Sequence, residues 1–153
     1  MSSPELTFKD ENGHLIVIMP TVLRQLLCYR QTASRSKEAA GVLIGECRGP
    51  HFVIQRISEP GPGDKRACVS VDRCGSHHQA AVDSAFDQSG GTLQYLGEWH
   101  THPEDSPSPS HIDKSSWRKN IVCNSPKILI IVGRKRIWAG KKIGKEIEEL
   151  TEA

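Results

Sequence analysis

The stretch GEWHTHPEDSPSPSHID, from Gly97 to Asp113, concentrates side chains that could bind a metal ion. His100 and His102 are two residues apart, and side chains at this spacing point to the same face of a β-strand. Imidazole nitrogen is among the commonest zinc ligands, so two histidines on one face would supply half of a tetrahedral shell. Asp113 could supply a third ligand. Three protein ligands and an open position are typical of a catalytic zinc, whose coordinated water has a pKa lowered to about 7.

Each part of this pattern also has an ordinary structural explanation. Two histidines at this spacing are common on exposed strands. Ser110 and Asp113 alone form the signature of a helix capping box, in which Ser110 caps the helix and Asp113 occupies its third position. The two interpretations are compatible, because a capped first turn could hold the Asp113 carboxylate against the end of the preceding strand. The combination of the histidines, Pro103 and the Ser-x-x-Asp sequence favours the metal site.

A hydrolytic metal site also needs a carboxylate that takes a proton from water and passes it to the leaving group. The spacing of residues does not identify this group. Glu98 shares the predicted strand face of the two histidines, and Glu104 and Asp105 lie in the loop that follows. Glu38 opens an apolar stretch far upstream. The residue types alone leave the choice among these acidic residues open.

The segment HTHPEDSPSPSHID, together with EAAGVLIG upstream, resembles the JAMM motif of the JAB/MPN metalloproteases. That motif consists of His-Ser/Thr-His-Pro, a fixed spacing to Ser-x-x-Asp, and a glutamate that opens an apolar strand ending in glycine. The resemblance implies that His100, His102 and Asp113 bind one Zn²⁺ ion per chain. It assigns general acid/base catalysis to Glu38 and stabilisation of the oxyanion of the tetrahedral intermediate to Ser110.

The resemblance also implies the class of protein. All the motif positions are intact, as in catalytic rather than scaffolding members, and Glu98 becomes a framework residue. The implied fold is α/β (α+β), with a mixed central sheet, about three helices and a cytidine-deaminase-like architecture. The implied activity is that of a zinc-dependent, deubiquitinase-like isopeptidase acting on a protein substrate with a flexible C-terminal tail.

The longer segment GEWHTHPE, together with Trp117 downstream, is similar to the sequences of the stand-alone JAB peptidases of CBASS antiviral operons. In those operons a cyclic-nucleotide synthase, the CD-NTase, is joined through its C-terminus to target proteins, and the JAB peptidase reverses the linkage. The resemblance therefore implies a conjugated CD-NTase as substrate. A JAB peptidase of another bacterial ubiquitin-like conjugation pathway is the nearest alternative, and a non-catalytic MPN-like interaction module is opposed by the intact Glu38.

Other zinc enzymes and a second metal site fit the residues less well. The HxHxDH motif of metallo-β-lactamases fails because position 104 is Glu, and a nucleobase deaminase needs HxE where His102 stands. Four further side chains could contribute to a second metal site but straddle a predicted strand and helix start: Cys68, Cys74, His77 and His78. We expect them to occupy ordinary packing and surface positions.

The elements that must position the candidate site follow from the hydrophobic pattern. A hairpin is predicted around Asn12-Gly13, whose positive φ angles suit a tight turn. Strands alternate with helices in the rest of the chain, which predicts an α/β or α+β fold. The strands are expected over 38–46, 51–58, 67–71, 92–102, 127–132 and 136–143, and the helices over 21–31, from a cap at Asp72 to 88, and over 110–122. The tail 145–153 fits either a strand or a helix.

The bulk composition narrows the class further. With 153 residues and ordinary apolar and charged fractions, the chain is expected to form one globular domain over 1–153. A net charge of +2 is too small to imply a nucleic-acid or membrane partner. No apolar run reaches the roughly 20 residues of a membrane span, and no signal-peptide pattern begins the chain. Five cysteines without a CxxC pair favour free thiols, so we expect a protein of the bacterial cytoplasm.

Overall fold

The computed structural model describes residues 5–67, 70–73, 75–122 and 124–153. The strands are β1 (Leu6–Lys9), β2 (Leu15–Ile18), β3 (Ala40–Arg48), β4 (His51–Ile57), β5 (Lys65–Ala67), β6 (Ser70–Asp72), β7 (Gln94–Thr101), β8 (Lys127–Val132), β9 (Ile137–Ile143), β10 (Glu146–Glu149) and β11 (Thr151–Glu152). The helices in these ranges are α1 (Pro20–Cys28), α2 (His77–Gln88) and α3 (His111–Asn120).

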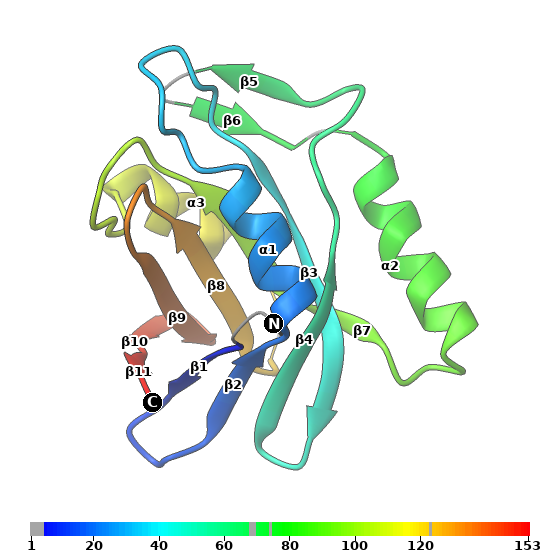
Figure 1. Cartoon of the computed structure of the whole chain (residues 1–153). Coiled ribbons are helices and arrows are strands. Elements are labelled where there is room, and N and C mark those ends of the chain that lie inside the picture. The colour runs from blue at the N-terminus through cyan, green and yellow to red at the C-terminus, as the bar shows by residue number, and fades with distance from the viewer. Residues whose placement is uncertain (1–4, 68–69, 74, 123) are drawn as a thin grey trace.

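One large mixed sheet dominates the fold, with its nine strands in the order β10-β9-β8-β7-β3-β4-β2-β1-β11. The pairs β2–β4 and β7–β8 are parallel, and the other neighbours are antiparallel. The remaining strands, β5 and β6, form a separate hairpin at the top of Figure 1. The predicted α/β (α+β) class, with a mixed sheet and about three helices, is confirmed.

The C-terminal tail nearly closes the sheet. β10 pairs with β9 at one edge and β11 pairs with β1 at the other, although only Leu150 separates β10 from β11. Leu150 is buried, and its N–H donates to the carbonyl of Ala139 at 2.9 Å. The tail that the sequence left between strand and helix is therefore two short strands, and it leaves few unpaired edge groups for unwanted strand addition.

The N-terminal hairpin and the first helix follow the sequence pattern closely. β1 and β2 pair around Gly13, which has a φ of +80° and whose N–H donates to the carbonyl of Asp10 at 3.1 Å. Pro20 occupies the first turn of α1, where its missing N–H costs nothing. Val22 and Leu26, on one face of α1, are buried in the main hydrophobic core.

The second helix differs from its prediction. Asp72 does not cap α2, which begins at His77 with Ser76 as its N-cap residue. The reason is that the chain through Asp72 is extended and pairs with Lys65 in the β5–β6 hairpin. The single strand predicted over 67–71 is likewise wrong, because the chain reverses between β5 and β6. Residues 68–69 of that prediction lie outside the described ranges.

No helix among the described residues is long and apolar enough to span a membrane. Cys28 and Cys47 are free thiols, and both are exposed.

Candidate metal centre

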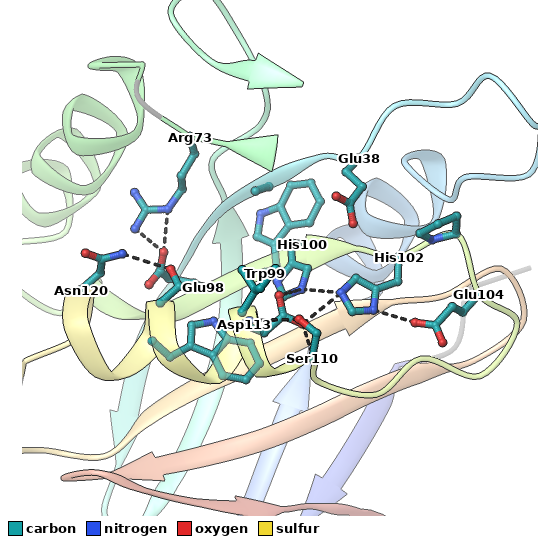
Figure 2. Close-up of a pocket in the computed structure, with 15 residues that line it drawn as sticks. Glu38, Arg73, Glu98, Trp99, His100, His102, Glu104, Ser110, Asp113 and Asn120 are labelled. Atoms are coloured by element: carbon teal, nitrogen blue, oxygen red, sulfur yellow. Dashed lines mark hydrogen bonds and ion pairs between the residues drawn. The ribbon is translucent and has the colours of Figure 1, made fainter. Parts of the chain in front are cut away.

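The two histidines lie at the end of β7, where the strand places them on one face (Figure 2). Trp99 and Thr101 point the other way and are 1 % and 0 % exposed, so the alternation of the strand fixes which side faces the pocket. His102 is the first residue beyond β7, and its N–H donates to the carbonyl of Val132 on β8 at 3.1 Å. The predicted arrangement of both histidines on one face is confirmed.

Asp113 reaches the same place from the first turn of α3. Ser110 is the N-cap, its Oγ accepting from the N–H of Asp113 at 3.0 Å, and Asp113 Oδ2 accepts from the N–H of Ser110 at 2.9 Å. The capping box and the carboxylate that faces the strand end are therefore the same structure. The cap orients Asp113, because both of its hydrogen bonds fix the first turn of the helix.

The side chains of His100, His102 and Asp113 converge on one point. The Nε2 atoms of the two histidines lie 3.1 Å apart, and they lie 3.3 Å and 3.1 Å from the Asp113 carboxylate oxygens. Burial alone would raise the pKa of Asp113, but hydrogen bonds from His100 and His102 outweigh it and hold that pKa well below its usual range. The ionised carboxylate and the paired imidazole nitrogens form a ligand set of the kind that zinc prefers.

Glu104 supports this ligand set from behind. Its Oε1 atom lies 2.9 Å from Nδ1 of His102, where it can accept a hydrogen bond from a ring that carries a proton at that nitrogen. A ring whose single proton is on Nδ1 has its lone pair on Nε2, the nitrogen that faces His100 and Asp113 and that a metal ion would bind. The four residues thus fit a metal ion, with the orientation of one ligand already set.

Glu38 lines the same pocket, above the three-residue cluster in Figure 2. It is only 6 % exposed and lies two residues before β3, rather than in that strand as its predicted start at 38 implied. Its backbone N–H donates to Ala67 O at 2.7 Å, so the β5 strand holds it on one side. Burial, together with the negative charge of Asp113, raises the pKa of Glu38 to about 7 against the opposing effect of His102.

Glu98 turns away from the metal cluster, although its strand position places it on the same face. Its carboxylate accepts from Arg73 Nε at 2.7 Å and also from Arg73 Nη2. The expected framework role of Glu98 agrees with this ion pair. The contact between Arg73 and Glu98 was not predicted from the sequence, because nothing in the residues around Arg73 indicates that its side chain reaches β7.

The pocket around these residues has a volume of about 770 Å³. Trp117 forms part of its wall. Its ring stacks on that of Trp138, with centroids 6.0 Å apart, and is tilted against that of His100, with centroids 5.8 Å apart. The other lining residues are Glu38, Ala40, Arg73, Glu98, Trp99, His102, Pro103, Glu104, Ser110, Ile112, Asp113, Ser116 and Asn120. The predicted catalytic and ligand residues therefore all border a single cavity.

A second cluster of histidine and aspartate lies at the start of α2. Asp64, His77 and His78 bring potential ligand atoms within 4.8 Å of one another. His78 is buried, however, with Ser58 Oγ 2.6 Å from its Nδ1 and Asp64 Oδ2 2.9 Å from its Nε2. The expectation of an ordinary packing role holds for His78, while Cys68 and Cys74 lie outside the described residues.

Comparison with known families defines the class of protein. A family described as prokaryotic homologs of the JAB domain matches residues 20–143. The chain therefore belongs to this family, and the prediction of a JAB-family enzyme is confirmed. Membership implies a metal, for which the His100, His102 and Asp113 cluster is the candidate site.

Individual relatives narrow the class. The chain is 58 % identical over 142 residues to a protein of Vibrio cholerae serotype O1 named CD-NTase/cGAS isopeptidase, covering 93 % of this chain and 91 % of the relative. An Escherichia coli protein of the same name is 52 % identical over 150 residues, covering 98 % and 96 % of the two chains. The solution structure of a Desulfitobacterium hafniense protein, at 17 % identity, has a TM-score of 0.58 over 86 % of this chain and 87 % of that one, which shows a shared fold.

Proposed function

We propose that this protein is a zinc-dependent isopeptidase of the bacterial cytoplasm that removes a CD-NTase from the target proteins to which its C-terminus is joined in CBASS defence. The observation that carries the activity is the convergence of His100, His102 and Asp113 beneath Glu38 in one pocket of a JAB fold. Relatives that match over almost their whole length are named CD-NTase/cGAS isopeptidases, which supports the substrate.

In this proposal His100, His102 and Asp113 hold one Zn²⁺ ion. When bound, zinc polarises the scissile carbonyl and lowers the pKa of water, the two services of a catalytic zinc site. Glu104 keeps the Nε2 lone pair of His102 directed to the site through its hydrogen bond to Nδ1. The capping hydrogen bonds of Ser110 do the same for the Asp113 carboxylate.

Glu38 is the general acid/base. Its carboxylate takes a proton as the water oxygen adds to the scissile carbonyl carbon, and it returns a proton to the nitrogen as the carbon–nitrogen bond breaks. A raised pKa suits both steps, because the group then accepts and releases protons near neutral pH. The products are the free C-terminal carboxylate of the modifier and a free amine on the target.

Ser110 would stabilise the oxyanion that develops on the carbonyl oxygen. Its Oγ accepts from the N–H of Asp113, so its own O–H proton can point into the pocket. Donors already fixed in this way stabilise a developing charge without further reorganisation. The same residue thus serves as helix cap and as hydrogen-bond donor.

The substrate of this proposal is an extended C-terminal tail, laid across the pocket between Arg73, which follows β6, and the residues of α3 that line it. Such a tail can pair with backbone groups, and small residues next to the scissile bond let the main chain approach the metal. The bond cleaved joins the last residue of the modifier to a target amine, such as a lysine side chain.

The test uses a CD-NTase fused through its C-terminal residue to a reporter protein. Release of the reporter should be blocked by a chelator, and the cut should fall directly after the native last residue. Equal cleavage of an internal peptide in unfolded protein, with the fusion left whole, would contradict deconjugation. A fusion of another ubiquitin-like modifier tests the alternative pathway.

Two glutamate variants separate the assigned roles. Glu38→Ala should lower hydrolysis by about 10²- to 10⁴-fold while zinc stays bound, because a general base is not a ligand. Glu98→Gln should be milder, since Glu98 meets Arg73 rather than the cluster. If the severities were reversed, Glu98 would be the base.

A further inference from the structure

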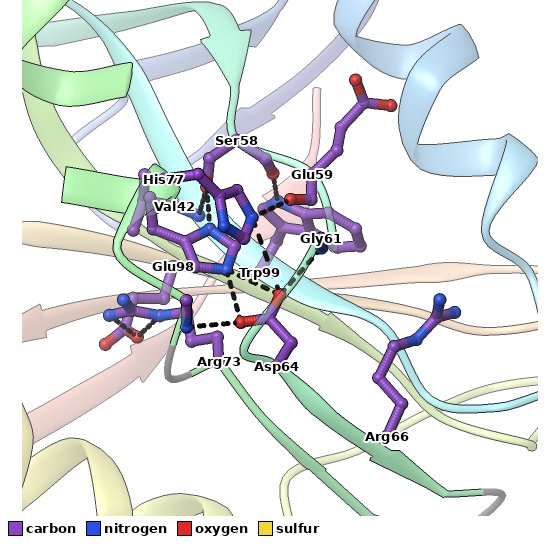
Figure 3. A network of polar contacts seen from close by, with 12 residues as sticks. Val42, Ser58, Glu59, Gly61, Asp64, Arg66, Arg73, His77, Glu98 and Trp99 are labelled. Atoms are coloured by element: carbon purple, nitrogen blue, oxygen red, sulfur yellow. Dashed lines mark hydrogen bonds and ion pairs between the residues drawn. The ribbon is translucent and has the colours of Figure 1, made fainter. Parts of the chain in front are cut away.

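A chain of hydrogen bonds joins Ser58, His78 and Asp64 in a network of polar contacts outside the candidate metal centre (Figure 3). Ser58 Oγ meets His78 Nδ1 at 2.6 Å, and His78 Nε2 meets Asp64 Oδ2 at 2.9 Å. The order of residues is that of a serine hydrolase, but Ser58 is 4 % exposed and its Oγ already accepts from the N–H of Val42 at 2.8 Å. A substrate cannot reach this serine, so the chain acts as a structural pin.

The pin joins the two ends of the segment 58–78, because Ser58 and Asp64 both contact His78. Asp64 Oδ2 accepts from the N–H of Gly61 at 3.1 Å, and Asp64 Oδ1 accepts from the N–H of Gly75 at 2.8 Å. Two parts of the chain that flank the β5–β6 hairpin are therefore tied to one carboxylate. Buried hydrogen bonds to a charged group are among the stronger ones in proteins. The residues that flank the β5–β6 hairpin on both sides are therefore held in place.

The β5–β6 hairpin and the residue that follows it contact the candidate site at two points. On β5, Arg66 Nε donates to the backbone carbonyl of Glu38 at 2.8 Å, and Ala67 O accepts from the N–H of Glu38 at 2.7 Å. After β6, the Arg73 guanidinium donates to Glu98 on β7. The hairpin thus spans the pocket from the general base to the framework glutamate.

The opposite side of the same backbone is held by β7. Ala39 N–H donates to Thr101 Oγ1 at 2.9 Å, and Thr101 N–H donates to Ala39 O at 2.9 Å. Thr101 is fully buried and belongs to the strand that carries the histidines. The backbone at Glu38 and Ala39 therefore lies between β7 on one side and the β5 strand on the other.

We propose that Arg66 is the exposed positioning residue of the general base, and that the pin of Ser58, His78 and Asp64 supports the β5 strand that carries it. The inference rests on the proposed function. Arg66 fixes the carbonyl of Glu38, and so the direction in which its side chain leaves the backbone. A general base must lie within hydrogen-bond reach of the water it activates, so a small displacement of this backbone lowers the rate.

Arg66→Met is the test variant, because Arg66 is exposed and its loss leaves the core unchanged. We expect kcat for the reporter fusion to fall about five- to tenfold with KM, zinc content and Tm nearly unchanged, and Arg66→Lys to restore most of the rate. Lys65→Met, which removes the same charge from the neighbouring position of β5, is the matched control and should behave as the wild type. Equal kcat in the two methionine variants, or an effect on KM alone, overturns the inference.

Hydrogen exchange provides a readout independent of activity. The amide of Glu38 donates to Ala67 O, so peptides that contain it should exchange faster in Arg66→Met than in Lys65→Met. If the wild type fails to cleave the fusion, the proposed function is wrong, and the exchange comparison still decides whether Arg66 holds Glu38. Unchanged exchange in Arg66→Met contradicts the positioning role.

Discussion

Two clusters of similar composition differ in what their ring nitrogens meet. In the site cluster of His100, His102 and Asp113, the two Nε2 atoms face each other and a carboxylate in an open pocket. In the pin cluster, His78 has Ser58 on one nitrogen and Asp64 on the other. Ser58 is buried, and the side chain of Asp64 is 1 % exposed. The same residue types therefore form a candidate metal centre in one place and a packing device in the other.

The carboxylates show the same contrast. Asp64 accepts from two backbone N–H groups as well as from His78, so its oxygens are satisfied within the fold. Asp113 accepts one backbone N–H, from Ser110, and directs the rest of its hydrogen-bonding capacity at the two histidines. A metal ion at the site cluster would replace protons on side chains that already converge. A metal ion at the pin cluster would instead break hydrogen bonds that hold the segment 58–78.

The largest expected effect is on metal content. His100→Ala and Asp113→Ala should each reduce bound zinc from about one equivalent per chain to nearly none and abolish hydrolysis, because a mononuclear site loses a ligand. His77→Ala, which replaces a histidine beside Asp64 and next to the pin cluster, is the matched control and should keep the zinc. Elemental analysis after dialysis measures all three. Zinc retained in both site variants, or lost from His77→Ala, would break the contrast between the clusters.

The next effect concerns the support of a ligand. Glu104→Ala removes the acceptor for His102 Nδ1–H and should weaken zinc binding about 10- to 100-fold, the usual cost of losing such a partner. Glu104→Gln keeps an acceptor oxygen and should lose less. Competition with a chromogenic chelator gives both affinities. Identical affinities for the wild type and Glu104→Ala would show that the orientation of His102 is set elsewhere.

The pin cluster should show the reverse pattern, a loss of stability without a loss of metal. Asp64→Asn replaces an acceptor of several hydrogen bonds by an amide with one acceptor oxygen and should cost about 2–3 kcal/mol of unfolding free energy. Hydrogen bonds from Gly75, His78 and Gly61 hold the Asp64 pKa low despite burial, so the stability it adds is present above its ordinary pKa and is lost as the pH falls. Denaturant unfolding measures the free energy of unfolding of Asp64→Asn, and elemental analysis measures its zinc content. A variant that keeps its stability but loses its zinc would contradict the prediction.

The smallest effect is a pH-dependent loss of stability caused by Glu38, the proposed general base. The pKa of Glu38 is about 7 in the fold against an ordinary value of 4.5, so the fold favours the protonated form and the stability it contributes is lost as the pH rises through about 7. Metal-free Glu38→Gln should therefore be more stable than the wild type by about 1–2 kcal/mol at about pH 8.5, with little difference at about pH 4. Denaturant midpoints at both pH values measure this. A difference that grows towards acid would have the wrong sign.

The sequence predicted the elements whose hydrophobic pattern is strong. The hairpin at Gly13, the strand through His100 and the helix after Ser110 all form where the pattern places them. The prediction failed at Asp72, because Asp72 pairs in an extended strand with Lys65, which lies between the strands predicted over 51–58 and 67–71. Local propensity could not reveal this pairing, since it depends on the chain reversing at a point without a tight-turn signature.

The sequence by itself predicted which side chains meet at the candidate metal centre, because His100, His102 and Asp113 are placed by local rules: alternation along a strand and capping of the next helix. The tertiary structure alone decided what the other polar residues do. It placed Arg73 on Glu98, Arg66 on the backbone of Glu38, and Ser58 beside His78. Those contacts join segments far apart in the chain, and no local periodicity encodes which distant partner satisfies a buried polar group.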